Sequence, residues 1–154
     1  MADSYTKIYL QIVFSPFGRE NTIPMKHKEE LHKYATGIIQ KRGHKLLAIN
    51  SMKDHIHILI GYNPSQLLPD LIRDIKANTS KFINEKNWIP GKFKWQEGYG
   101  CFSYSYRESD SMIKYVMNQE LHHSKQSFRE EYFTFLNEYN VEYNPEYLFE
   151  YYDN

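Results

Sequence analysis

Hydrophobic and polar residues alternate along three stretches in the first part of the chain, and a period of two is typical of a β-strand with one polar face. These predicted strands cover residues 5–14, 45–52 and 55–61. Only Lys53 and Asp54 separate the second strand from the third, so we expect these two strands to form a hairpin. A fourth strand is expected in the second half of residues 93–106, a stretch rich in aromatic residues and glycine.

Other stretches carry apolar residues at every third or fourth position, which is the spacing of a helix that buries one face. The predicted helices cover residues 24–41, 63–85, 109–123 and 128–139. Pro24 suits the first turn of a helix, and Gly43 suits the position just after one. We expect residues 63–65 to cap the second helix, and Ser109 or Asp110 to cap the third.

The resulting order, β-α-β-β-α-β-α, is that of the split βαβ or ferredoxin-like fold, which RRM domains share. We therefore predict an α+β protein with one antiparallel sheet, two helices on one face of the sheet, and the other face free for a ligand. A further, tyrosine-bearing helix follows the sheet near the C-terminal end. The chain has no internal repeat and no long linker, so residues 1–154 are expected to form a single domain.

The charges refine this picture only slightly, because 19 basic residues balance 19 acidic ones. From residue 126 onward the chain is acidic and rich in tyrosine, with seven acidic residues and one basic residue, so the preceding part is basic. A basic body with an acidic tail fits a nucleic-acid binder, but it also fits many soluble enzymes. The single cysteine, Cys101, excludes a disulfide framework and a thiolate metal site. Without an apolar run that resembles a signal peptide or a membrane span, the expected location is the cytoplasm.

The strongest candidate chemistry lies on the third predicted strand. Since side chains alternate between the two faces of a strand, His55 and His57 point to the same side, and Ile56 points away. Two imidazoles on a rigid strand can hold one divalent metal ion from one side, although such pairs are also common without a metal. The donor type suits Zn²⁺, Ni²⁺ or Co²⁺ as well as harder cations. Asp54 is expected either to turn the hairpin or to orient one histidine through a hydrogen bond.

A second candidate feature lies on the predicted helix 109–123. Tyr115 and Gln119 are four residues apart, so they share one face of a helix and could place a nucleophile beside a metal ligand. The alternative is a tyrosine packed on the sheet and a glutamine in solvent. The apolar stripe of this helix is expected to consist of Ile113, Val116, Met117 and Leu121. His122 and His123 are expected on the solvent side, as neutral surface residues or DNA contacts.

These two features resemble the motifs of a known family. Residues 54–60 resemble the His-hydrophobe-His (HUH) motif of nucleases that act on single-stranded DNA, and residues 115–123 resemble the Tyr-x-x-x-Gln helix of the single-tyrosine HUH transposases. Those transposases belong to small bacterial insertion sequences that move as single-stranded DNA. Three further segments are also similar to the family: residues 12–15, 93–103 and 128–148. The resemblance therefore covers nearly the whole chain.

The resemblance implies a specific chemistry. It implies that His55, His57 and Gln119 hold one divalent cation, Mg²⁺ or Mn²⁺, and that Tyr115 is the nucleophile. Tyr115 would attack a backbone phosphate of single-stranded DNA, form a 5′-phosphotyrosine and free a 3′-hydroxyl that later rejoins strands. It also implies recognition of DNA hairpins at the element ends, a homodimer in which the tyrosine helix of one chain often completes the site of the other, and a bacterial or archaeal cytoplasm.

Three basic residues are candidate DNA contacts: Arg19, Arg73 and Lys76. Arg73 and Lys76 also fit a solvated helix face.

The sequence also fits other functions. One alternative keeps the family but changes the task, to a domesticated relative that processes chromosomal hairpin repeats. Another is a non-catalytic ferredoxin-like module that binds nucleic acid through aromatic residues of its sheet. A histidine-triad hydrolase is disfavoured because Leu59 stands where a third alternating histidine is needed, and a zinc hydrolase lacks an obvious acidic ligand beyond Asp54.

Overall fold

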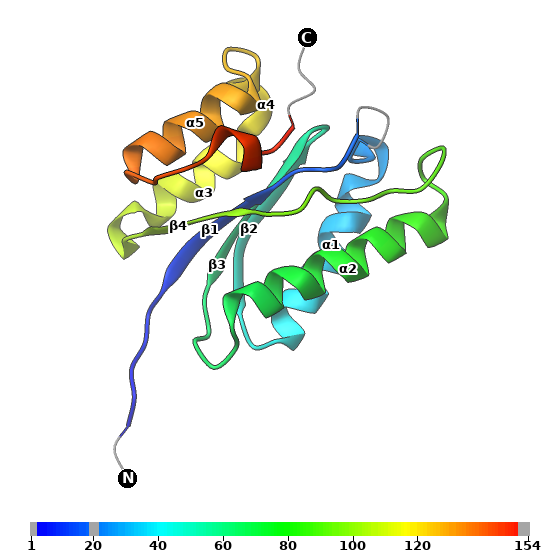
Figure 1. Ribbon diagram of the computed structural model, residues 1–154. Coiled ribbons are helices and arrows are strands. Elements are labelled where there is room, and N and C mark those ends of the chain that lie inside the picture. Colours follow the sequence, from blue (N-terminus) through cyan, green and yellow to red (C-terminus); the bar gives the residue numbers. More distant parts are fainter. Residues whose placement is uncertain (1–2, 19–21, 151–154) are drawn as a thin grey trace.

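The architecture follows the predicted order of elements, as a computed structural model of residues 3–18 and 22–150 shows (Figure 1). The strands are β1 (Tyr9–Phe14), β2 (Lys45–Met52), β3 (His55–Gly61) and β4 (Gly100–Tyr104). The helices are α1 (Lys28–Lys41), α2 (Leu68–Lys86), α3 (Ser109–Met117), α4 (Gln119–His123) and α5 (Phe128–Glu138). Short 3₁₀ turns cover Met25–His27, Tyr106–Glu108 and Pro145–Tyr147.

The four strands form one antiparallel sheet in the order β2-β3-β1-β4. This is the strand order of the ferredoxin-like fold, so the predicted fold class is confirmed. β2 and β3 form the expected hairpin, and β1 pairs with β3 so that Val13 lies opposite His57. The histidine-bearing strand is therefore an inner strand, held by a neighbour on each side.

One face of the sheet packs against α1 and α2, as predicted (Figure 1). The alternating residues of β1 and β3 supply the core on this side, and the helices add the apolar residues that recur at helical spacing. The main core residues on this face are Ile12, Phe14, Ile56, Ile58, Ile60, Leu31, Ala35, Leu71 and Ile75. Since Ile56 and Ile58 point toward these helices, period two sends His55 and His57 to the opposite face.

The opposite face is covered rather than free, which corrects our expectation. α3 and α5 lie on this side of the sheet (Figure 1), and Val116 of α3 packs against Leu59 of β3. Phe135 of α5 lies against Phe102 of β4, with ring centroids 5.4 Å apart. The prediction failed because it assigned no packing partner to the apolar residues of α5. The polar residues of β3 on this face consequently lie inside the protein.

Local contacts shift several predicted boundaries. β1 begins at Tyr9 rather than at residue 5, and α2 begins at Leu68, where Leu67 is the N-cap without a side-chain hydrogen bond. Asn63 does not cap this helix, because its Oδ1 accepts a hydrogen bond from the backbone N–H of Ser65 and closes a separate turn. Gly43, in contrast, ends α1 as expected and has a φ of 88°, in the left-handed region that glycine adopts readily.

The predicted helix 109–123 is broken at Asn118, which separates α3 from α4. In a continuous helix the carbonyl of Val116 would accept from the N–H of residue 120, but here it accepts from Asn50 Nδ2 of β2 at 2.9 Å. The break turns Met117 and Leu121 outward, with exposed fractions of 55% and 60%. The predicted apolar stripe is therefore wrong at these two positions.

Within residues 3–18 and 22–150, no helix has both the length and the apolar character that crossing a membrane requires.

Candidate active site

His55 and His57 are fully buried neighbours on β3, with ring centroids 5.0 Å apart and ring planes at 85°. Each ring is anchored through its Nδ1 atom. His55 Nδ1 donates to Asp54 Oδ1 at 2.8 Å, and His57 Nδ1 lies 3.0 Å from Gln11 Nε2 on β1. Since Nδ1 is engaged in both rings, the Nε2 atoms are the ones left to face α4 and α5.

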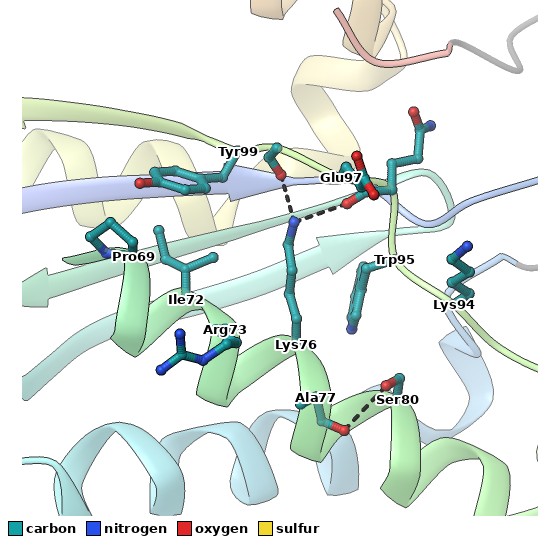
Figure 2. Close-up of a pocket in the computed structure, with 12 residues that line it drawn as sticks. Pro69, Ile72, Arg73, Lys76, Ala77, Ser80, Lys94, Trp95, Glu97 and Tyr99 are labelled. Atoms are coloured by element: carbon teal, nitrogen blue, oxygen red, sulfur yellow. Dashed lines mark hydrogen bonds between the residues drawn. The ribbon is translucent and has the colours of Figure 1, made fainter. Parts of the chain in front are cut away.

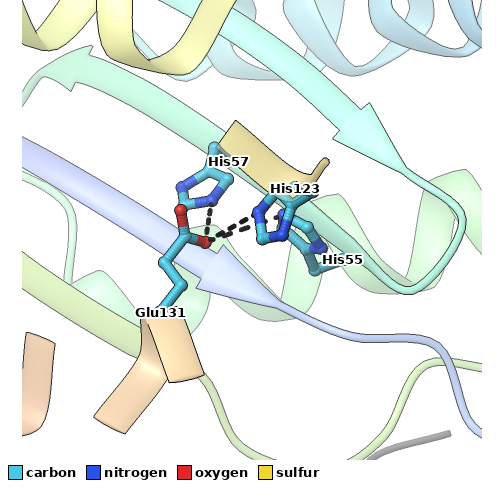
Figure 3. Close-up of side chains that lie close together, drawn as sticks. All are labelled: His55, His57, His123 and Glu131. Carbon is cyan, nitrogen blue, oxygen red and sulfur yellow. Dashed lines mark hydrogen bonds and ion pairs between the residues drawn. The ribbon is translucent and has the colours of Figure 1, made fainter. Parts of the chain in front are cut away.

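Two further side chains meet these Nε2 atoms and close a compact cluster (Figure 3). One ligand atom from each of His55, His57, His123 and Glu131 lies within 4.8 Å of every other. Glu131 Oε1 lies 2.9 Å from His57 Nε2, 3.3 Å from His123 Nε2 and 3.8 Å from His55 Nε2. Imidazole nitrogens and a carboxylate oxygen are ligands for divalent cations, so the donor set fits one such ion.

Gln119, the first residue of α4, reaches the same cluster. Its side chain is fully buried, and its Oε1 lies 3.0 Å from His55 Nε2 and 2.9 Å from His123 Nε2. Its Nε2 donates to the carbonyl of Tyr115 at 3.3 Å, across the break between α3 and α4. The amide oxygen that we expected beside the histidine pair is thus within hydrogen-bond distance of His55.

Tyr115, near the end of α3, points its hydroxyl into the cluster. The hydroxyl donates to Glu131 Oε2, and the ring centroid lies 6.2 Å from that of His57. Burial and the negative charge of Glu131 both raise the pKa of Tyr115 above its usual value. Tyr115 is therefore a neutral phenol in this arrangement, and it needs another group to take its proton before it can act as a nucleophile.

The charges within the cluster are set by Glu131. Burial alone would raise the pKa of Glu131, but the hydrogen bonds from His123 and His57 outweigh burial and hold that pKa far below its usual range. Burial lowers the pKa of His57, with Glu131 offsetting part of this effect. The pKa of His123 is raised, because its contact with Glu131 outweighs its burial. These pKa shifts favour the neutral form of His57, which is the form that can bind a metal, and the protonated form of His123.

Comparison with known proteins identifies the family. Residues 4–119 match a protein-family model described as "Transposase IS200 like". The chain belongs to the IS200-like transposase family. The matched region includes both histidines of β3 as well as Tyr115 and Gln119, so the resemblance that the motifs indicated is confirmed.

A curated relative supports the same assignment. The chain is 25% identical over 89 residues to the ISDra2 transposase TnpA of Deinococcus radiodurans. The aligned region is 53% of this chain and 62% of the relative, so the match spans less than two thirds of that protein.

Two solved structures share the fold. A candidate transposase from D. radiodurans R1 superposes with a TM-score of 0.59 at 20% identity, over 77% of this chain and 96% of the other. A REP-associated tyrosine transposase, solved in complex with a REP hairpin, has a TM-score of 0.59 at 12% identity, over 80% of this chain and 73% of the other. At these identities the likeness shows a shared fold and no more.

The motifs did not reveal His123 or Glu131, and both lie beyond the matched residues 4–119. His123 was expected at the surface, but the exposed fraction of its side chain is only 9%. A signal was present for each residue. His123 follows Gln119 by four positions, so the two share a helix face. Glu131 stands among inward-facing apolar residues of α5, next to Tyr132 and between Phe128 and Phe135.

The candidate DNA contacts on α2 lie away from the histidine cluster. Arg73 and Lys76 line a pocket of about 430 Å³ between α2 and residues 94–99 (Figure 2). Lys76 Nζ donates to the carbonyls of Gln96 and Gly98 at 2.9 and 2.6 Å, and burial lowers its pKa to about 8. Lys76 therefore ties the segment before β4 to α2. Arg73 is exposed and pairs with Asp70 at 3.1 Å, and Arg19 lies outside the described residues.

Proposed function

We propose that this IS200-like transposase cleaves and rejoins single-stranded DNA through a covalent 5′-phosphotyrosine intermediate. The observation that carries the proposal is the position of the Tyr115 hydroxyl, which is hydrogen-bonded within the same buried cluster as His55 and His57. A nucleophile next to a set of metal-binding donors is what metal-assisted phosphoryl transfer needs. Family membership supports the same chemistry.

The residues divide into metal ligands and groups that orient them. His55, His57 and Gln119 would hold the cation, with Mg²⁺ or Mn²⁺ as the expected ion in the cell. When bound, the cation withdraws charge from the oxygens of the target phosphate. Asp54 fixes the ring of His55 through Nδ1, so that Nε2 faces the site. Such fixed orientation matters because phosphoryl transfer depends mainly on positioning and electrostatics.

The proposed reaction has two balanced steps. In the first, Tyr115 loses its proton, its oxygen bonds to phosphorus, and the bond from phosphorus to the DNA 3′-oxygen breaks, leaving a 3′-hydroxyl after proton uptake. In the second, a 3′-hydroxyl attacks the phosphotyrosine, and Tyr115 regains its proton as the phosphodiester re-forms. The number of phosphorus–oxygen bonds does not change, so joining requires no nucleotide cofactor.

The proposed partner is single-stranded DNA with hairpins at the element ends. The REP-associated tyrosine transposase of the same fold was solved with a hairpin, which supports this choice. Arg19 and Arg73 remain candidate phosphate contacts. Lys76 does too, although its ammonium already donates to two carbonyls.

The homodimer remains a prediction. Within a single chain, the Tyr115 hydroxyl and the proposed metal-binding donors meet at one carboxylate, that of Glu131. Light scattering of the purified chain, alone and with hairpin DNA, measures the mass of the assembly. A mixture of Tyr115→Phe and His57→Ala chains then separates the two arrangements, because it regains activity only where the tyrosine of one chain serves the metal site of another.

The decisive experiment is adduct formation. The chain is incubated with single-stranded oligonucleotides from the DNA flanking its own gene, with Mn²⁺ or with EDTA, and covalent complexes are separated on a denaturing gel. We expect an adduct that EDTA prevents and that Tyr115→Phe abolishes. Tyr106→Phe is the matched control, because Tyr106 is an exposed tyrosine just before α3. DNA binding without an adduct under any metal condition would contradict the proposal and favour a non-catalytic binding module.

A further inference from the structure

Glu131 faces the nucleophile and the histidines at the same time. Its Oε1 lies 2.9 Å from His57 Nε2 and 3.8 Å from His55 Nε2, while its Oε2 accepts the hydrogen bond of the Tyr115 hydroxyl. No other carboxylate in the described part of the chain belongs to this cluster. One side chain thus spans the gap between the two halves of the proposed site.

The location of Glu131 is costly for a carboxylate. Its exposed fraction is 1%, and it occupies an inward position of α5 among Phe128, Tyr132, Phe135 and Leu136. Burying an ionised carboxylate is unfavourable unless charged or polar groups surround it, and an apolar residue would serve core packing at least as well. A functional role for the charge explains why the core contains it.

The predicted ligand set also lacks what Glu131 offers. His55, His57 and Gln119 are neutral ligands, whereas Mg²⁺ and Mn²⁺ prefer hard oxygen ligands that carry negative charge. Glu131 Oε1 is such an oxygen, and it already lies among the imidazole nitrogens that face the site. A carboxylate ligand would offset part of the charge of the ion.

We propose that Glu131 is a ligand of the catalytic cation through Oε1 and that it positions Tyr115 through Oε2. This inference rests on the proposed function and extends it to α5, which lies beyond the residues matched by the family model. The cation then links β3, α4 and α5, and the hydrogen bond to Tyr115 holds the nucleophile at a fixed place beside it. Metal binding and docking of α5 on the sheet support each other.

The test measures metal binding by the full chain without DNA, so that it does not depend on activity. Free Mn²⁺ is titrated by electron paramagnetic resonance against the wild type, Glu131→Gln and Glu130→Gln. Glu130 is the matched control, because it is an exposed neighbour on α5 whose replacement removes the same charge. We expect Glu131→Gln to weaken Mn²⁺ binding by about 10- to 100-fold and Glu130→Gln to leave it within about twofold.

The position of Tyr115 needs a readout of its own. With 3-fluorotyrosine at residue 115, the ¹⁹F resonance reports the hydrogen bond to Glu131. We expect Mg²⁺ to shift this resonance in the wild type, because the ion and the phenol share one carboxylate, and we expect no such shift in Glu131→Gln. A resonance that Mg²⁺ shifts equally in both proteins overturns the positioning role.

Further variants separate this inference from the proposed function. If the wild type binds no Mn²⁺, or if His57→Ala binds it as well as the wild type, the metal site of the proposed function fails. If His57→Ala loses binding while Glu131→Gln keeps wild-type affinity, only the role of Glu131 is overturned. Where circular dichroism shows that Glu131→Gln is unfolded, Glu131→Asp takes its place, because it keeps the charge and withdraws the oxygens by one methylene. An affinity within about twofold of the wild type then overturns the inference.

Discussion

One buried side chain, Asn50 of β2, is hydrogen-bonded at the break between α3 and α4. Asn50 Nδ2 donates to the carbonyl of Val116 at 2.9 Å and lies 3.4 Å from the carbonyl of Met117, while Oδ1 accepts from the N–H of Ser51 at 3.0 Å. Tyr115 directly precedes these carbonyls. Replacing Asn50 with alanine therefore removes the hydrogen bonds that fix the end of the Tyr115-bearing helix to the sheet.

The structure indicates the size of the effect. Asn50→Ala leaves the buried carbonyl of Val116 without a donor, and an unsatisfied buried polar group lowers the free energy of unfolding by about 1–3 kcal/mol. For a domain of this length, each kcal/mol lowers the melting temperature by roughly 2–4 °C, so we expect a decrease of about 2–12 °C. Because small displacements of reacting groups can slow a reaction about a hundredfold, adduct formation should fall by roughly ten- to a hundredfold at temperatures where the variant stays folded.

Urea unfolding followed by circular dichroism gives the stability change, and the denaturing-gel assay gives the rate of adduct formation. Asn137→Ala is the matched control, because Asn137 is exposed on α5 and its replacement should change the free energy of unfolding by less than about 0.5 kcal/mol. If Asn50→Ala is as stable as this control, the Asn50 hydrogen bonds do not stabilise the fold. If the variant loses stability yet forms the adduct at the wild-type rate, Asn50 does not position Tyr115.

Three further predictions concern single positions. Gly100→Ala should lower the free energy of unfolding by about 1–3 kcal/mol in urea, because the new Cβ would lie 2.8 Å from the buried ring of Tyr132; an unchanged value contradicts this packing. Ser127→Ala should lower it by about 1 kcal/mol, because its Oγ caps α5 by accepting from the N–H of Glu130 at 3.2 Å, whereas a change no larger than that of Asn137→Ala argues against the cap. Burial raises the pKa of the Cys101 thiol from 9.0 to about 11. Its alkylation by iodoacetamide at pH 8, followed by mass spectrometry, should therefore be about 100-fold slower than that of a thiol whose pKa is 9.0. The rate should rise about tenfold per pH unit until pH approaches that pKa, and fast alkylation at pH 8 is the contrary result.

The strands were predictable because each carries its own pattern. Residues 55–61 alternate strictly enough to assign both the strand and the face of each histidine, and the two residues that precede them set the hairpin. The boundaries that failed depend on distant contacts. The start of α2 is one example, because Asn63 uses its side chain for a local turn and leaves Leu67 as the cap.

The candidate site was predictable only where one segment carries the signal. His55 and His57 stand on one strand, and Tyr115 and Gln119 stand one helical turn apart, so spacing identified each pair. Glu131 belongs to neither pattern. It reaches the histidines only because α5 packs on the sheet face that we expected to be free, and its signal was an acid among apolar residues of a helix.

A single hairpin thus positions both halves of the proposed site. β3 supplies His55 and His57, and β2 supplies Asn50, whose amide ends α3 just after Tyr115. Asn50 and Val116 are 66 residues apart in the sequence, so no local spacing could predict that the helix breaks there. Since β2 and β3 are hydrogen-bonded to each other, one rigid hairpin positions His55, His57 and the proposed nucleophile, Tyr115. With the helix broken between α3 and α4, Gln119 lies buried beside His55. Met117 and Leu121 lie at the surface instead of forming an apolar stripe.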